Sequence, residues 1–186
     1  MACKGPGTTA SPDQTSPYGV SRGGNEASRS SPEAPQDTAI VVAANRTENY
    51  FPKLLGKRFA VVANQTSVIF QKDGGYTHLV DSLIASGLAP VRVFAPEHGF
   101  RGEADAGEHV MDGVDKRSGL PVISLYGSNR KPAPEQLEGL DLVLFDIQDV
   151  GVRFYTYIAT LQLVMEACAS AGIPILVLDR PNPNGG

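Results

Sequence analysis

The chain has 186 residues, of which 41% are hydrophobic and 19% charged, and this is enough for one globular domain with a buried core. The 16 Lys and Arg residues are scattered, and the formal net charge is −4. That balance argues against nucleic acid or an anionic membrane surface as a partner. The two cysteines, Cys3 and Cys168, do not indicate a disulfide framework.

Residues 1–37 differ in composition from the rest of the chain. They are rich in Ser, Pro and Gly, and Val20 is their only Leu, Ile, Val or Phe. Such a segment cannot bury enough apolar surface to offset the entropy lost on ordering. The sequence therefore predicts a flexible tether over 1–37 and a folded domain over 38–186.

The folded part alternates between short apolar runs and stretches with helical spacing. The apolar runs are expected as strands, at residues 39–43, 59–63, 91–95, 121–126, 142–145 and 173–178. The helical stretches are residues 48–56, broken at Pro52, followed by 76–86, 134–138 and 156–171. This alternation predicts an α/β fold, with a parallel sheet covered by helices on both faces.

Polar residues follow four of the predicted strands directly. The carboxyl ends of parallel strands share one edge of the sheet, where open α/β folds bind ligands. We therefore expect these segments to line one cleft: Asn64 to Ser67, Pro96 to Gly102, Asp146 to Tyr155, and Asp179 to Asn184.

The segment "FAPEHGFRGEADAGE", residues 94–108, concentrates charge at the end of a predicted buried strand. Burying charge at such a place is costly unless the charged groups are solvated, paired with opposite charges or required for function. A carboxyl pair for glycoside cleavage fits it, with Glu97 and Glu108 as candidates and Glu103 and Asp149 in reserve. His98 and His109 with nearby carboxylates would instead suit a metal ion. Nucleotide binding ranks lowest, because no glycine fingerprint follows the first strand.

Several of these residues have purely structural interpretations as well. Arg153 could pair with Asp149 or hold a substrate carboxylate, and Tyr155 could belong to the core or stack on a sugar ring. Asp146 could brace neighbouring backbone amides. His78 is expected on a solvent-facing helix without a role.

Four strings, "FAPEHGFRGEADAGE", "GLPVISLYG", "DLVLFDIQDVGVRFYTYI" and "VLDRPNPNGG", together resemble the NamZ family of exo-β-N-acetylmuramidases, also called DUF1343. The resemblance implies a Rossmann-like three-layer domain that needs no nicotinamide cofactor. It implies hydrolysis that releases N-acetylmuramic acid (MurNAc) from the non-reducing end of peptidoglycan fragments. Glu97 and, less directly, Glu108 match the catalytic region. The expected substrate-binding residues are Asn64, His98, Arg101, Asp149, Arg153 and Tyr155.

Members of this family continue beyond the "RPNP" segment into a second domain, which is expected to be missing here. A muropeptide-binding half-domain without activity is therefore one alternative, and a metal-dependent hydrolase is another. Ala2-Cys3 followed by the tether resembles the start of a mature bacterial lipoprotein. The expected location is the cell envelope or periplasm, with a lipid anchor at Cys3.

Overall fold

The computed structural model describes residues 40–102 and 112–184. Its helices are a 3-10 helix at Ala43–Asn45, α1 (Thr47–Leu54), α2 (Leu79–Ala85), α3 (Pro134–Leu137) and α4 (Tyr157–Ala171). Its strands are β1 (Phe59–Ala63), β2 (Val68–Phe70), β3 (Tyr76–His78), β4 (Arg92–Ala95), β5 (Gly113–Val114), β6 (Pro121–Ser124), β7 (Leu142–Asp146) and β8 (Ile175–Val177). None of the helices in these two ranges has the length and apolar character needed to cross a membrane.

Six strands form one sheet in the order β5-β6-β4-β1-β7-β8. All the pairings in this sheet are parallel except the one between β5 and β6. From β1 the chain moves outward through β4 to β6, then returns to the other side of β1 for β7 and β8. This is the strand order of a Rossmann-like fold, with its switch point between β1 and β7. The predicted α/β class, with a mainly parallel sheet flanked by helices, is confirmed.

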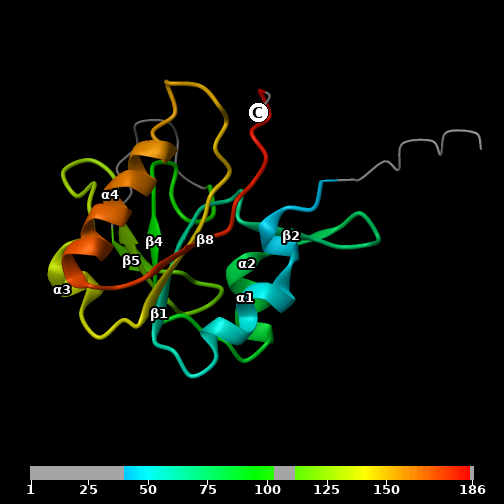
Figure 1. Ribbon diagram of the computed structural model, residues 1–186, viewed down its shortest axis with the longest axis horizontal. Coiled ribbons are helices and arrows are strands. Elements are labelled where there is room, and N and C mark those ends of the chain that lie inside the picture. Colours follow the sequence, from blue (N-terminus) through cyan, green and yellow to red (C-terminus); the bar gives the residue numbers. More distant parts are fainter. Residues whose placement is uncertain (1–39, 103–111, 185–186) are drawn as a thin grey trace, which may run out of the picture. The chain divides into compact units, whose positions relative to one another are not determined.

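The sheet is covered on both faces, which makes three layers (Figure 1). Alternate residues of β1 point to opposite faces because the side-chain period of a strand is two. Phe59, Val61 and Ala63 pack with residues of α1 and α2. Ala60 and Val62 pack with residues of α3 and α4. All five residues of β1 are buried, as expected for a central parallel strand.

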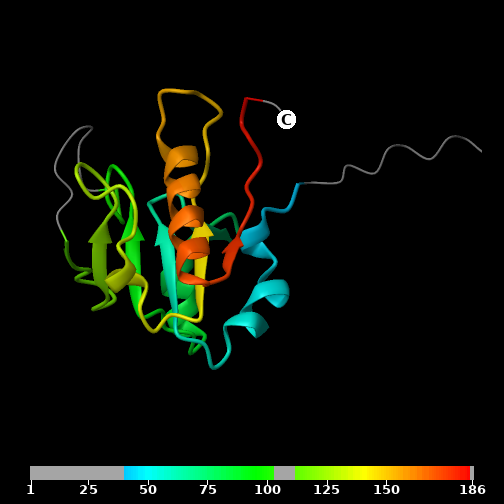
Figure 2. The same cartoon turned by 60° about the vertical axis from the view of Figure 1, so that its left-hand side comes forward.

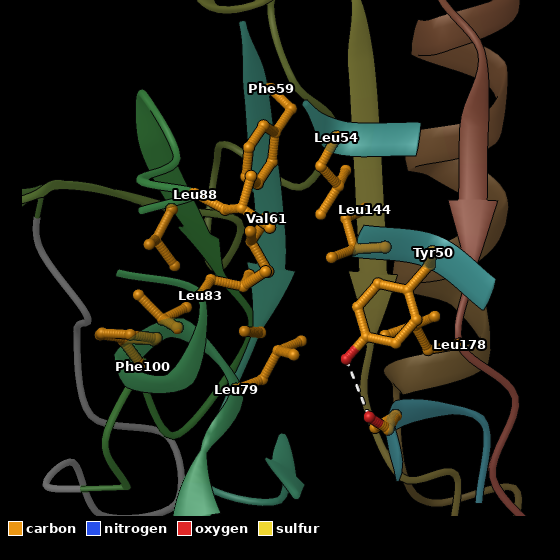
Figure 3. Close-up of a cluster of buried hydrophobic side chains, with 14 of the residues drawn as sticks. Tyr50, Leu54, Phe59, Val61, Leu79, Leu83, Leu88, Phe100, Leu144 and Leu178 are labelled. Carbon is orange, nitrogen blue, oxygen red and sulfur yellow. Dashed lines mark hydrogen bonds between the residues drawn. The ribbon is translucent and has the colours of Figure 1, made fainter. Parts of the chain in front are cut away.

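The α1/α2 face has a continuous apolar core (Figure 3). Tyr50 and Leu54 of α1 meet Val61 and Leu144 of the sheet there. The Tyr50 hydroxyl donates a hydrogen bond of 2.8 Å to the carbonyl of Ala44, so this buried polar atom has a partner. Burial raises the pKa of this hydroxyl. Each fully buried large side chain contributes roughly 1.5–3 kcal/mol to folding.

Three sequence-based assignments are wrong in detail. Residues 40–42 have no regular structure, and 43–45 form a 3-10 helix, where a strand over 39–43 was expected. Pro52 does not break α1, which continues to Leu54 because Tyr50 and Leu54 are held in the core. The predicted helix over 76–86 begins as β3, which pairs with β2 in an antiparallel hairpin, and becomes helical only at Leu79.

Candidate active site

The carboxyl ends of β1, β4, β6, β7 and β8 lie at one edge of the sheet. The loop after β7 and the segment after β8 both rise from this edge (Figure 2). The loops after β1 and β4 touch each other, since a Cβ on Gly102 would lie 3.0 Å from the Cβ of Gln65. Gly102 has a φ of +73°, which glycine adopts without strain. The expected convergence of polar segments is therefore present.

Asn64 lies at the switch point, directly after β1, and is fully buried. Its Oδ1 accepts hydrogen bonds from the Thr66 amide and hydroxyl, at 2.9 and 2.6 Å. Its Nδ2 has no hydrogen-bond partner among residues 40–102 and 112–184. Burial raises the pKa of the Tyr157 hydroxyl, and the neighbouring Asn64 and Gln65 side chains oppose that shift. The Asn64 amide and the Tyr157 hydroxyl therefore lie next to each other at the switch point, without a hydrogen bond of standard geometry from Asn64 Nδ2 among the described residues.

Glu97 occupies the turn after β4 and is half-buried. The Thr156 hydroxyl, just before α4, lies 3.4 Å from Glu97 Oε2. The Tyr126 hydroxyl, after β6, lies near Glu97, and its interaction with this carboxylate raises the pKa of Tyr126. Side chains from two other parts of the sheet edge therefore hold the leading catalytic candidate.

His98 has a left-handed backbone, with a φ of 70°, followed by Gly99 at 78°. A non-glycine residue in this region costs on the order of 1–3 kcal/mol and occurs most often at functional sites. The turn is closed by a 3.0 Å hydrogen bond from the Gly99 amide to the Pro96 carbonyl. This tight turn sets where the Glu97 side chain projects.

A cavity of about 260 Å³ opens beside Glu97. It is lined by polar side chains from the ends of β4 and β6 and by the first turns of α4: Glu97, Tyr126, Arg130, Thr156 and Thr160. Its apolar wall consists of Leu125, Ala159 and Leu163. The volume is close to the lower limit for small-ligand pockets, roughly 300 Å³. We call it the Glu97 cavity.

Asp149, Arg153 and Tyr155 lie on the loop after β7 and do not line the Glu97 cavity. Asp149 lines a second cavity of about 220 Å³ with Tyr157, Arg180 and Asn182, and its Oδ2 accepts a 3.2 Å hydrogen bond from the Gly151 amide. Arg153 is exposed, and Tyr155 packs against Tyr157 with ring centroids 5.8 Å apart. Asp149 and Glu97 thus line two different cavities of the described residues.

Arg101 is held by protein carboxylates on two sides. Its guanidinium binds Asp81 of α2 at 2.9 Å and Asp115 at 2.8 Å. This pairing holds the pKa of Asp115 well below its usual range, although burial opposes the shift. Arg101, which was expected to bind substrate, is thus already bound by two carboxylates of the protein, and it anchors the loop after β4.

His78 does not face solvent on a helix, contrary to the sequence-based prediction. It ends β3 and caps α2, and its Nδ1 accepts a 3.2 Å hydrogen bond from the Val80 amide. Its Nε2 lies 3.0 Å from the carbonyl of Asn64. Burial lowers the pKa of its ring. Its role is to support the backbone that carries Asn64.

The residues that sequence reasoning missed are Tyr126, Arg130 and Thr156. Tyr126 ends the predicted strand 121–126, Thr156 begins the predicted helix 156–171, and Arg130 lies between predicted elements, so their positions in the sequence do not mark them as partners of Glu97. Glu103, Glu108 and His109 lie outside the described residues, and so does Cys3.

The sequence model of the N-terminal part of the exo-β-N-acetylmuramidase NamZ matches residues 59–186, which include Asn64, Glu97 and the residues around them. The chain belongs to the NamZ family. A relative, the peptidoglycan β-N-acetylmuramidase NamZ of Bacillus subtilis (strain 168), is 46% identical over 139 residues, covering 74% of this chain and 33% of the relative.

Crystal structures of two DUF1343 family proteins from Bacteroides fragilis NCTC 9343 support the same assignment. Each is 39% identical to this chain, with TM-scores of 0.67 and 0.63. The matches cover 78% and 77% of this chain and 35% of each relative. This NamZ-family chain thus spans about a third of the length of the relatives it matches.

Proposed function

We propose that the chain carries the Glu97 half of an exo-acting glycoside hydrolase site that releases non-reducing-end MurNAc from peptidoglycan fragments. The observation that supports this most directly is a half-buried Glu97, held by Tyr126 and Thr156 over a sugar-sized cavity, in a chain that resembles a peptidoglycan β-N-acetylmuramidase.

In this proposal Glu97 acts as the general acid. It protonates the glycosidic oxygen while the bond to the anomeric carbon breaks, which is the step such enzymes catalyse with a carboxylic acid. A second carboxylate activates water or stabilises the developing positive charge. Glu108 is the proposed second group, because it belongs to the same charged segment as Glu97 and matches the catalytic region of the family, with Asp149 as the other candidate. The distance between the two carboxyls would separate a retaining from an inverting course.

The buried Asn64 amide supports substrate orientation in this scheme. An unpaired buried donor is costly, and a substrate oxygen would remove that cost on binding. Tyr157 lies beside it and would present its hydroxyl to the same substrate. The proposed roles of His98, Arg153 and Tyr155 are to shape the entrance to this site.

A second candidate function is muropeptide binding without turnover. It is favoured by one observation, that the chain spans only about a third of its relatives. The experiment is to incubate the chain with MurNAc-β-1,4-GlcNAc and follow free MurNAc by mass spectrometry. Glu97→Gln is expected to abolish release, whereas Glu48→Gln, an exposed carboxylate on α1, is expected to leave it unchanged.

The outcomes separate the two candidates. Saturable disaccharide binding without release would favour the binding module, and neither binding nor release would overturn both. Near-wild-type release by Glu97→Gln would remove Glu97 from the mechanism. Release that stops on chelation and returns with a divalent ion would instead favour a metal-dependent hydrolase.

We propose the cell envelope as the place of action, in line with a peptidoglycan substrate, and Cys3 as the site of a lipid anchor. In a bacterial host the chain with its natural leader is expected in the membrane fraction, and Cys3→Ala is expected to move it to the soluble fraction. Equal partition of the two forms would contradict the anchor.

A further inference from the structure

Arg130 lies on the Glu97 cavity with part of its guanidinium unoccupied. Its Nε donates a 3.0 Å hydrogen bond to the Gly127 carbonyl, which fixes the base of the planar group. Among residues 40–102 and 112–184, no carboxylate lies within ion-pair distance of it. The two terminal Nη groups can therefore form the paired donors that bind a carboxylate in a bidentate way.

The exposed Arg130 side chain lies near Tyr126, and both line the Glu97 cavity. Its electrostatic effect lowers the pKa of the Tyr126 hydroxyl, against the stronger opposite effect of Glu97. The lining of the cavity thus includes a cation and a carboxylate, and Leu125 and Leu163 supply apolar surface. This arrangement suits a ligand with one anionic group, one reacting oxygen near Glu97 and small apolar substituents.

MurNAc has those features. It differs from N-acetylglucosamine (GlcNAc) by a lactyl ether, which adds one carboxylate and one methyl group. The other arginines near this edge are less suitable partners for that carboxylate. Arg101 is bound by Asp81 and Asp115, and Arg153 does not line the Glu97 cavity.

We propose that Arg130 is the specificity-determining residue of this site, binding the lactyl carboxylate of MurNAc in the Glu97 cavity. The inference rests on the proposed function and extends it by naming the group that distinguishes MurNAc from GlcNAc. Thr156 contacts Glu97 in the same cavity, which Tyr126 also lines.

The test measures binding by calorimetry with two ligands, MurNAc and its neutral lactyl methylamide. The wild-type chain is expected to prefer the acid by about tenfold or more, the contribution typical of a charge-assisted pair. Arg130→Gln is expected to lose this preference and to bind the amide as the wild type does. Arg153→Gln tests the competing arginine, and Arg46→Gln, an exposed arginine just before α1, is the matched control.

A retained acid preference in Arg130→Gln, or its loss in Arg153→Gln instead, would overturn the proposal. Equal wild-type binding of acid and amide would overturn it too, while leaving the proposed hydrolase site standing. If the wild type bound neither ligand, the proposed function would fail together with this inference. Circular dichroism of each variant checks that the fold is retained.

Discussion

The guanidinium of Arg180 binds both carboxylate oxygens of Asp146, with Nε to Oδ1 at 2.6 Å and Nη2 to Oδ2 at 2.9 Å. Both side chains are buried, at 3% and 0% exposure. Asp146 ends β7 and Arg180 follows β8, so the pair joins two neighbouring strand ends. Arg180 Nη2 also donates to the Val68 carbonyl at 2.7 Å, which ties β2 to the same point.

Arg180→Met is expected to destabilise the chain by about 3–5 kcal/mol, because it leaves the Asp146 carboxylate buried without a partner. Urea denaturation followed by circular dichroism measures this loss. Asp146→Asn combined with Arg180→Met is expected to be less destabilising than Arg180→Met alone, since no charge then remains buried. Arg117→Met is the control, because Arg117 pairs with Asp81 while 71% exposed, and it is expected to cost less than about 1 kcal/mol.

Asp115→Asn is expected to lower the free energy of unfolding at pH 7 by about 1–3 kcal/mol, through weaker binding of Arg101 and Ser118. The folded-state pKa of Asp115 is lowered, so its stabilisation is present above the unfolded pKa of about 3.9 and is lost as the pH falls through the folded value. The difference between wild type and variant should therefore shrink below about pH 4.

Unfolding curves at pH 7 and pH 3 check this expectation. Asp73→Asn is the control, because Asp73 is exposed and an asparagine keeps the acceptor for the Gly75 amide. A difference between wild type and Asp115→Asn that stays constant over this range would contradict the ion-pair explanation.

His78 is expected to make the wild-type chain less stable under mildly acidic conditions. Its folded-state pKa is lowered by burial, so the neutral ring is favoured in the folded state. The associated stabilisation is present above the unfolded pKa of about 6.5 and declines as the pH falls below it. The loss is about 1.4 kcal/mol for each unit of lowering.

His78→Asn keeps a side-chain acceptor for the Val80 amide and removes the titrating group. The wild type should lose more stability than His78→Asn between pH 7 and pH 5, as measured by thermal or urea unfolding. Parallel curves for the two proteins would show that the ring does not titrate with folding.

Gly151→Ala is expected to destabilise the loop after β7 by about 1–3 kcal/mol. Gly151 has a φ of +70°, and an added Cβ would lie 2.8 Å from Asn182 Cγ. Gly56→Ala is the matched control, because Gly56 has a φ of +69° with no heavy atom within 4 Å. The difference in destabilisation between Gly151→Ala and Gly56→Ala therefore measures the clash with Asn182. Equal losses of unfolding free energy in the two variants would contradict this clash.

The sequence predicted the buried central strands, because a continuous apolar run is enough to recognise them. Residues 59–63 and 142–145 are continuous apolar runs, and both are buried central strands in the sheet. The helix ending at Gly172 was also predictable, because Gly172 adopts a φ of 68° as the terminating residue. The positions of Asn64 and Glu97 at strand ends were predictable too, because Asn64 directly follows the run 59–63 and Glu97 comes soon after the run 91–95.

Only the tertiary structure decided elements and roles that depend on a partner far along the chain. Residues 39–43 look like a strand in the sequence, but residues 40–43 pair with no strand in the part of the chain that the structure describes, while β3 pairs with β2 in a stretch predicted as helix. Arg101 and Arg130 carry the same guanidinium group, and the sequence alone does not show which of them is free to bind a ligand. Folding places Asp81 and Asp115 against Arg101 and places Arg130 on the Glu97 cavity, and local sequence does not encode which distant carboxylate an arginine will meet.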